Sequence, residues 1–267
     1  GTDTMGSVRV PAAYCGIAGI KPTFGAIDRD GLAILCPSLG AIGARAQDVS
    51  LLWPALKALA SKNVPDGWYE RQERTDLSGL KFGIPRQLQE VDCDPKILTG
   101  LGIARNAIED LGGIVIEIDL SGWNPGKARR AGLLLTEAEG AVELADQMAQ
   151  PGAISDHLHG LLEYGRQASA EKLEAARATV SAAAGSIDAA WEHTDAILMP
   201  TAPQCAFRHG SGAPANQADL TALANFAGCP AVTLPVPLKR EALPASIQLM
   251  APSWEDASVL RWAELLS

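Results

Sequence analysis

The chain has 267 residues, of which 47% are hydrophobic and 20% are charged, and its formal net charge is -9. This composition is typical of a globular protein that is long enough to bury a core without disulfide or metal staples. The negative charge argues against direct nucleic-acid binding, which needs phosphate-neutralising Lys and Arg. The sequence shows no apolar run of the ~18 residues that span a bilayer and no signal peptide, so we expect a cytoplasmic protein without membrane contact.

The first half of the chain predicts a helix and then a strand–helix–strand unit. Residues 1–45 are rich in Gly and poor in helix formers, whereas residues 46–60 read as a helix in which Pro54 marks a kink or an early turn. The next predicted elements are a strand at residues 80–85, a helix from Asp94-Pro95 to about Leu111, and a strand at residues 114–118. This order favours a parallel or mixed sheet.

The second half predicts a helical block followed by short strands. Residues 127–193 are rich in Ala, Glu and Leu and are expected to be mostly helical. Three short strands are then predicted, at residues 196–199, 231–234 and 246–249. The first two are expected to end at Pro200 and Pro235. Residues 254–266 read as an amphipathic helix with Ser253 as its N-cap. The pattern as a whole predicts an α/β fold.

The cysteines and histidines do not indicate a metal or redox site. The five cysteines are widely spaced and form no Cys-x-x-Cys pair, so we expect small buried residues in a reducing compartment. His157 and His159 are two residues apart and would point to different faces of a helix. We therefore expect neither a metal nor a cofactor. Glu137 and Glu139, in an Ala/Leu-rich helix, are expected to be solvated.

The most informative segment is residues 1–7, Gly-Thr-Asp-Thr-Met-Gly-Ser. Two glycines and small polar residues allow a turn in which successive backbone N–H groups face one point. Acyl transfer needs such groups beside a hydroxyl, because the hydroxyl attacks a carbonyl while N–H donors stabilise the oxyanion, by roughly 3–4 kcal/mol for one donor. On this local chemistry alone, a plain turn with an N-cap serine is an equal alternative.

Two other motifs fit this segment poorly. Gly1 and Gly6 have the spacing of a phosphate-binding loop, but Ser7 stands where that loop needs lysine. A Gly-x-Ser-x-Gly elbow would need glycines where Met5 and Arg9 stand. We expect Arg9, two residues beyond the serine, to anchor the turn by hydrogen bonds.

A resemblance to a known family favours the catalytic interpretation of this segment over the plain turn. Residues 1–16 follow the pattern Gly-Thr-Asp-Thr-x-Gly-Ser-x-Arg-x-Pro-Ala-Ala-x-Cys-Gly, and residues 19–23 read Gly-Ile-Lys-Pro-Thr. This stretch is very similar to the signature of the amidase signature family, and three later segments, residues 195–201, 225–232 and 243–249, resemble further elements of it. The resemblance implies a mixed β-sheet covered by α-helices on both faces, in one domain over residues 1–267 that is incomplete at its N-terminus.

The same resemblance implies a Ser–cis-Ser–Lys mechanism with Ser7 as the nucleophile. The implied oxyanion donors are the backbone N–H groups of Thr4, Met5, Gly6 and Ser7. In the family the relay serine and the buried basic lysine lie upstream of the nucleophile and match no residue here; Lys21 belongs to the Lys-Pro-Thr segment instead. We therefore expect an isolated chain starting at residue 1 to be inactive, as a truncated chain, a proteolytic fragment or one of two chains.

The implied reaction is hydrolysis of a small-molecule amide to a carboxylate and ammonia or an amine. The alternative is an amidotransferase subunit, or an inactive relative, that needs the missing N-terminal part or a partner, either a companion chain or a second copy in a homodimer. Met5 occupies a position often held by Gly in the family, and its side chain is expected to narrow the acyl pocket. Ala245-Ser246 is a further departure, since the family has Gly at the second position.

Overall fold

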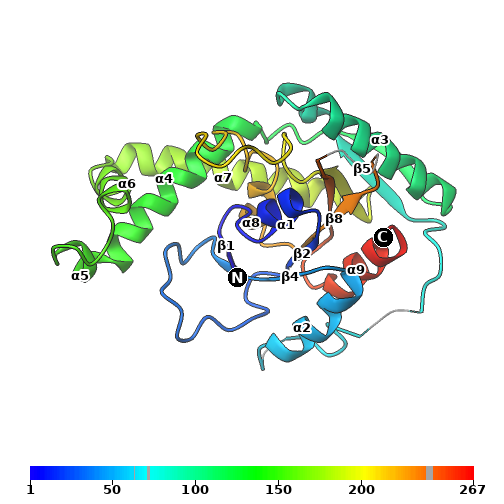
Figure 1. Ribbon diagram of the computed structural model, residues 1–267, viewed down its shortest axis with the longest axis horizontal. Coiled ribbons are helices and arrows are strands. Elements are labelled where there is room, and N and C mark those ends of the chain that lie inside the picture. Colours follow the sequence, from blue (N-terminus) through cyan, green and yellow to red (C-terminus); the bar gives the residue numbers. More distant parts are fainter. Residues whose placement is uncertain (63, 71–72, 239–242) are drawn as a thin grey trace.

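A computed structural model describes residues 1–62, 64–70, 73–238 and 243–267 and contains a mixed sheet (Figure 1). β5 is parallel to β6 and β7, and the other neighbouring strands are antiparallel. The predicted mixed sheet is therefore confirmed. In sheet order the seven strands are β4 (Ala44–Ala46), β2 (Ala18–Lys21), β8 (Ala231–Val236), β9 (Ala245–Met250), β7 (Ala196–Pro200), β5 (Lys81–Pro85) and β6 (Ile114–Ile118).

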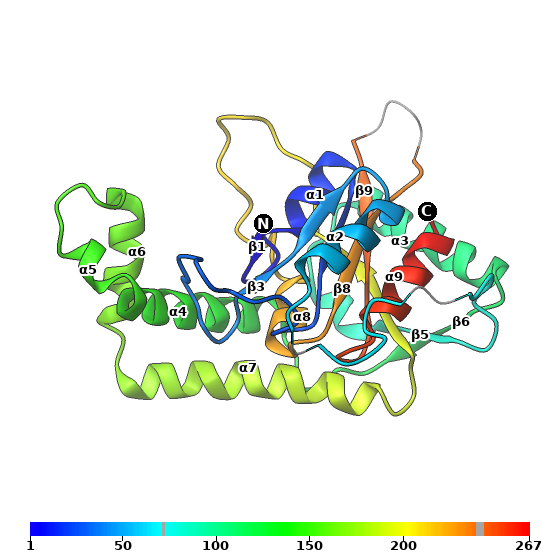
Figure 2. The same cartoon turned by 90° about the horizontal axis from the view of Figure 1, so that it is seen from below.

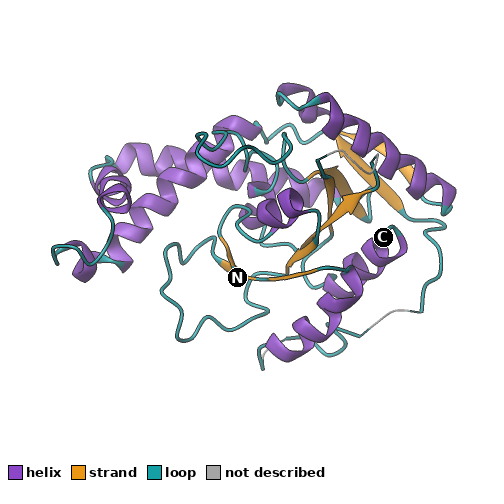
Figure 3. Cartoon of the chain, viewed as in Figure 1, coloured by secondary structure: helices purple, strands orange, loops and turns teal. Residues whose placement is uncertain are grey.

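A second, two-stranded sheet and a set of helices surround the main sheet (Figure 3). β1 (Thr2–Asp3) pairs with β3 (Ala41–Ile42), just ahead of the predicted functional turn. The helices of the described residues are α1 (Arg9–Cys15), α2 (Leu52–Leu59), α3 (Pro95–Asp110), α4 (Pro125–Glu143), α5 (Ala145–Met148), α6 (Asp156–Arg166), α7 (Ala170–Ala190), α8 (Ala222–Phe226) and α9 (Asp256–Leu265), with short 3-10 helices at Val49–Leu51 and Arg86–Glu90.

Successive side chains along each strand point to opposite faces of the sheet, so the strands contribute to two hydrophobic cores, one on each face. In β7, Leu198 packs into a core completed by α2 and α9, whereas Ile197 and Met199 pack into a core completed by α7 and α8. All three side chains are fully buried. Burial on both faces explains why the strands read as continuous apolar runs, and it confirms that helices cover both faces.

Helices α4, α6 and α7 form an arm that extends beyond the sheet (Figure 2). α4 packs along both α6 and α7. α4 also contacts α8, and its Gly132 lies close to the Met5 sulfur, so this arm borders the predicted turn. No helix in the described part of the chain combines the length and apolar character needed to cross a membrane.

Three details of the sequence-based prediction need correction. Helix α1 lies within the glycine-rich residues 1–45, which are poor in helix formers and in which no helix is assigned from the sequence. The strand expected to end at Pro235 runs on to Val236. β2 pairs with β8 at Ala231 to Thr233, so Pro235 lies beyond that pairing and its missing N–H removes no ladder bond on that side.

The third correction concerns the start of the C-terminal helix. The sequence predicts Ser253 as its cap, but α9 begins at Asp256 and has Glu255 at its N-cap position. Trp254 adopts a φ of 73°, and its N–H donates to the Thr23 hydroxyl at 2.9 Å. This contact turns the chain before the helix starts, a tertiary effect that the local pattern does not contain.

Candidate active site

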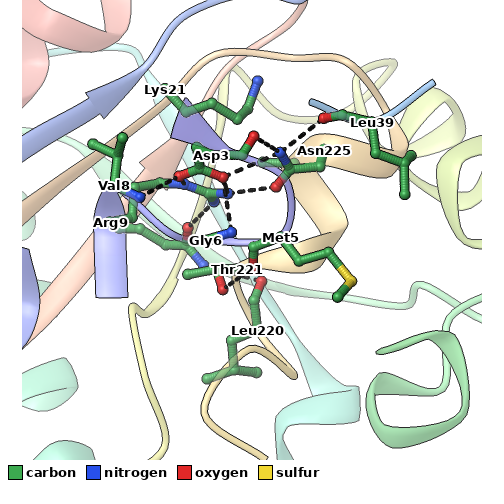
Figure 4. Close-up of polar contacts among 12 residues, drawn as sticks. Asp3, Met5, Gly6, Val8, Arg9, Lys21, Leu39, Leu220, Thr221 and Asn225 are labelled. Atoms are coloured by element: carbon green, nitrogen blue, oxygen red, sulfur yellow. Dashed lines mark hydrogen bonds and ion pairs between the residues drawn. The ribbon is translucent and has the colours of Figure 1, made fainter. Parts of the chain in front are cut away.

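The segment between β1 and α1 is a tight turn folded around the carboxylate of Asp3 (Figure 4). Its two oxygens accept the backbone N–H of Gly6 at 2.7 Å and that of Val8 at 3.2 Å. Ser7, between these two residues, is exposed to solvent, whereas Gly6 and Val8 are buried. The carboxylate thus folds the chain so that the serine side chain projects outward.

Gly6 is required at the centre of this turn for two reasons. Its φ is 131°, a region that residues with a side chain rarely adopt. A Cβ atom at this position would lie 2.2 Å from the Thr221 hydroxyl oxygen, which is far closer than van der Waals contact. That hydroxyl is fixed, because it donates to the carbonyl of Met5 at 2.6 Å.

Arg9 anchors the turn, as the sequence predicted. Its guanidinium is fully buried, and its Nε and Nη2 atoms donate to the Asp3 carboxylate at 3.1 and 3.0 Å. Nη2 also donates to Asn225 Oδ1 at 2.6 Å, and Nη1 donates to Gln248 Oε1 at 3.0 Å. One side chain therefore ties the turn to α8 and to β9.

Asn225 completes the shell around Asp3 from the far end of the sequence. Its Nδ2 donates to the Asp3 carbonyl at 2.8 Å, to the Asp3 carboxylate at 3.1 Å and to the Leu39 carbonyl at 3.2 Å. Burial by itself would raise the pKa of Asp3, but the charge and hydrogen bonds of Arg9, helped by Lys21 and Asn225, hold that pKa below its ordinary value. Asp3 is therefore a stable carboxylate.

Lys21 lies beside Asp3, on the side away from Met5 and Thr221 (Figure 4). The side chain is fully buried, and its Nζ donates to the Pro22 carbonyl at 2.8 Å. Burial lowers the pKa of Lys21 to about 8, the largest cause being loss of hydration. Lys21 is fully buried and is not among the residues that line the cavity beside Ser7, in agreement with the expectation that it is not the base for Ser7.

A cavity of about 620 Å³ opens beside Ser7, and Thr4, Met5, Gly6 and Ser7 all line it. The structure thus brings together the four residues that the sequence singled out. Sequence reasoning missed the rest of the wall, which comes from α1, α4 and two loops: Val10, Pro11, Tyr14, Cys15, Leu35, Leu133, Thr136, Phe207, Ala213, Gln217 and Ala218.

Some expected roles change once the contacts are known. The Gly6 N–H, expected among the oxyanion donors, instead points at Asp3, so Gly6 serves the turn through its backbone conformation. Glu139 is not simply solvated, because it accepts from the Ser38 N–H at 3.0 Å and the Ser38 hydroxyl at 2.6 Å. Glu137 is half-buried, and burial raises its pKa.

The cysteines follow the prediction only in part. All five are free thiols, and Cys36, Cys205 and Cys229 are buried as expected. Cys93 is half-buried. Cys15, the last residue of α1, is exposed and lines the cavity beside Ser7.

These features define an α/β protein with an exposed serine held beside a cavity by a buried carboxylate. The family model described as Amidase matches residues 1–260, and the chain therefore belongs to the amidase family.

Individual relatives agree with this assignment. A glutamyl-tRNA(Gln) amidotransferase subunit of Desulforamulus reducens is 29% identical over 100% of this chain and 62% of its own length. The crystal structure of the corresponding Thermotoga maritima protein has a TM-score of 0.78 at 23% identity, covering 98% of this chain and 60% of that one. A bacterial aryl acylamidase of the amidase signature family has a TM-score of 0.85 at 18% identity, covering 99% and 61%. The chain spans about 62% of the length of its curated relatives.

The close contact at Gly6 generates a first prediction. Gly6→Ala introduces a strained φ and a collision with Thr221, so we expect a loss of more than about 1 kcal/mol in the free energy of unfolding. Gly102→Ala, in α3 where a Cβ meets open space, is the matched control and is expected to be neutral or stabilising. Denaturant unfolding of both variants of the full-length protein measures the difference; equal stabilities would contradict the account.

The buried Lys21 generates a prediction about pH. Its folded-state pKa of about 8 lies below the ordinary value of 10.5, so between these values the unfolded state binds more protons than the folded state. The free energy of unfolding should therefore gain a contribution that grows as pH rises from about 8 to 10.5. The difference between the wild type and Lys21→Met, followed by denaturant unfolding across this range, should show that slope. A difference that is flat with pH would contradict the prediction.

Proposed function

We propose that the full-length protein hydrolyses amide bonds through an acyl-enzyme formed on Ser7. The observation that carries this proposal is the exposed serine on a turn that Asp3 and Arg9 fix, at the wall of a cavity large enough for a small molecule. Membership of the amidase family supports the same reaction.

In the proposed reaction the Ser7 Oγ attacks the carbonyl carbon of a carboxamide and gives up its proton to a base. The C–N bond then breaks, and the amine or ammonia leaves after it gains a proton. This step produces an ester between the acyl group and Ser7, and water then cleaves the ester to release the carboxylate. The net products are a carboxylic acid and ammonia or an amine.

The oxyanion formed during attack needs N–H donors that lie beside the serine. We propose the backbone N–H groups of Thr4, Met5 and Ser7 for this role, since all three residues line the cavity. The Gly6 N–H already donates to Asp3, so Gly6 helps by allowing the backbone to turn. The rigidity that Arg9 gives to this segment means that the donors need no reorganisation when the charge develops.

The proton of Ser7 requires an acceptor that the described cavity wall does not provide, since none of its lining residues is Lys or His. The family resemblance implies a relay serine and a neutral lysine, neither of which matches a residue of this chain. The proposal therefore concerns the full-length protein. We also propose a cytoplasmic location, which the five free thiols support.

A second candidate function is that of one chain in an amidotransferase. The similarity to glutamyl-tRNA(Gln) amidotransferase subunits supports it, since such a chain works within a larger assembly. In that case a companion chain would carry the acceptor for the released ammonia. Co-purification of the full-length protein with such a chain, and ammonia transfer that depends on it, would favour this candidate over a free-standing amidase.

The nucleophile is tested by covalent labelling. We expect a fluorophosphonate probe to modify the full-length protein at Ser7, and Ser7→Ala to abolish both labelling and amide turnover, with kcat/KM falling by about 1,000-fold or more. Ser50→Ala, at an exposed serine away from the cavity wall, is the control and should behave as wild type. An adduct mapped to another serine would refute the assignment.

A further inference from the structure

We propose that the cavity wall built by this chain selects carboxamides whose acyl group is uncharged and apolar. It would then disfavour amides such as glutamine, whose acyl group carries charges. This inference rests on the function proposed above, and it names the substrate class of the same site.

The side chains around the cavity are predominantly apolar. The apolar lining comes from Leu133 of α4, from Leu35 of the loop between β2 and β3, and from Phe207 and two alanines of the loop between β7 and α8. Met5 lies next to the proposed oxyanion donors, with its sulfur close to the backbone of Gly132, where a Cβ atom would approach it to 2.8 Å. Gly132 in α4 therefore makes room for an apolar side chain beside the reacting carbonyl.

The polar groups on the wall are neutral, and Tyr14, Gln217 and Thr136 among them already have hydrogen-bond partners. Gln204 Nε2 donates to the Tyr14 hydroxyl at 2.7 Å, and that hydroxyl points to Gln217 Oε1 at 3.5 Å. Burial raises the pKa of Tyr14, so its hydroxyl stays protonated and uncharged. The Thr136 hydroxyl donates to the Gly132 carbonyl at 2.9 Å. Phe207 packs edge-to-face on the Tyr14 ring, with the ring centroids 5.7 Å apart.

Two buried ion pairs lie close to the site. Arg9 and Asp3 neutralise each other beneath the turn. Arg129 of α4 binds Asp219, which follows the wall residue Ala218, at 2.5 Å, and both are largely buried. None of the described residues that line the cavity is Asp, Glu, Lys or Arg. A substrate carboxylate or ammonium in this cavity would lose its hydration without gaining a charged partner, which is strongly unfavourable.

The inference is tested with amides of one length and different charge. Pentanamide, glutaramate and glutamine share a five-carbon acyl chain, and they carry no charge, one charge and two opposite charges. For the full-length enzyme we expect kcat/KM on pentanamide to exceed that on glutaramate and on glutamine by about 100-fold. Equal or faster turnover of a charged amide would overturn the inference and leave the proposed function standing. If no amide is hydrolysed and Ser7 is not labelled, both fail.

A charge introduced into the wall gives a second, independent readout. Leu133 is 37% exposed, so Leu133→Arg is compatible with folding and places a guanidinium at the cavity. We expect this variant to raise the glutaramate-to-pentanamide ratio of kcat/KM by about 10-fold, because the carboxylate gains a partner. Leu161→Arg, at a leucine of α6 that is 39% exposed and outside the wall, should leave the ratio unchanged. An unchanged ratio in Leu133→Arg, or an equal rise in both variants, would contradict the proposal.

Discussion

The site depends on one buried ion pair, between Asp3 and Arg9. Both side chains are completely removed from water, which is costly unless every charge is compensated. Here the carboxylate accepts two backbone N–H groups of the turn as well as the guanidinium, and the guanidinium also binds the side-chain oxygens of Asn225 and Gln248. Both side chains therefore have hydrogen-bond partners for almost all of their polar atoms, so the pair holds the turn rigidly in place.

This network explains why distant parts of the sequence form one site. β9 and α8 supply Gln248 and Asn225, more than 200 positions after Asp3, while Thr221 holds the Met5 carbonyl. The turn with Ser7 is therefore fixed by the last quarter of the chain. The loop between β7 and α8, which ends at Thr221, also supplies part of the cavity wall, so the region that fixes the turn lines the cavity beside Ser7 as well.

The sequence predicted the regular elements well and the site only in part. Short apolar runs bounded by Pro and Gly identified most strands, because strands buried on both faces are apolar throughout. Helix formers and apolar periodicity identified the long helices. Asp3, Ser7 and Arg9 lie close together in the chain, so the sequence could indicate this part of the site as well. Thr221 and the apolar residues of the cavity wall were missed, since their roles arise only when loops meet in space. The extension of β8 past Pro235 has the same origin, because it depends on which neighbouring strand is present.

The central claim is that the Asp3 carboxylate holds Ser7 and its donors in a reactive arrangement. The most direct measurement is the rate at which a fluorophosphonate labels Ser7 in full-length Asp3→Asn, Arg9→Lys and the double variant, with near-UV circular dichroism as a check on folding. The account predicts that each single variant labels about 100-fold more slowly, and that the double variant is no slower than the worse single one, because both act through one network. A folded Asp3→Asn variant that labels at the wild-type rate would contradict it.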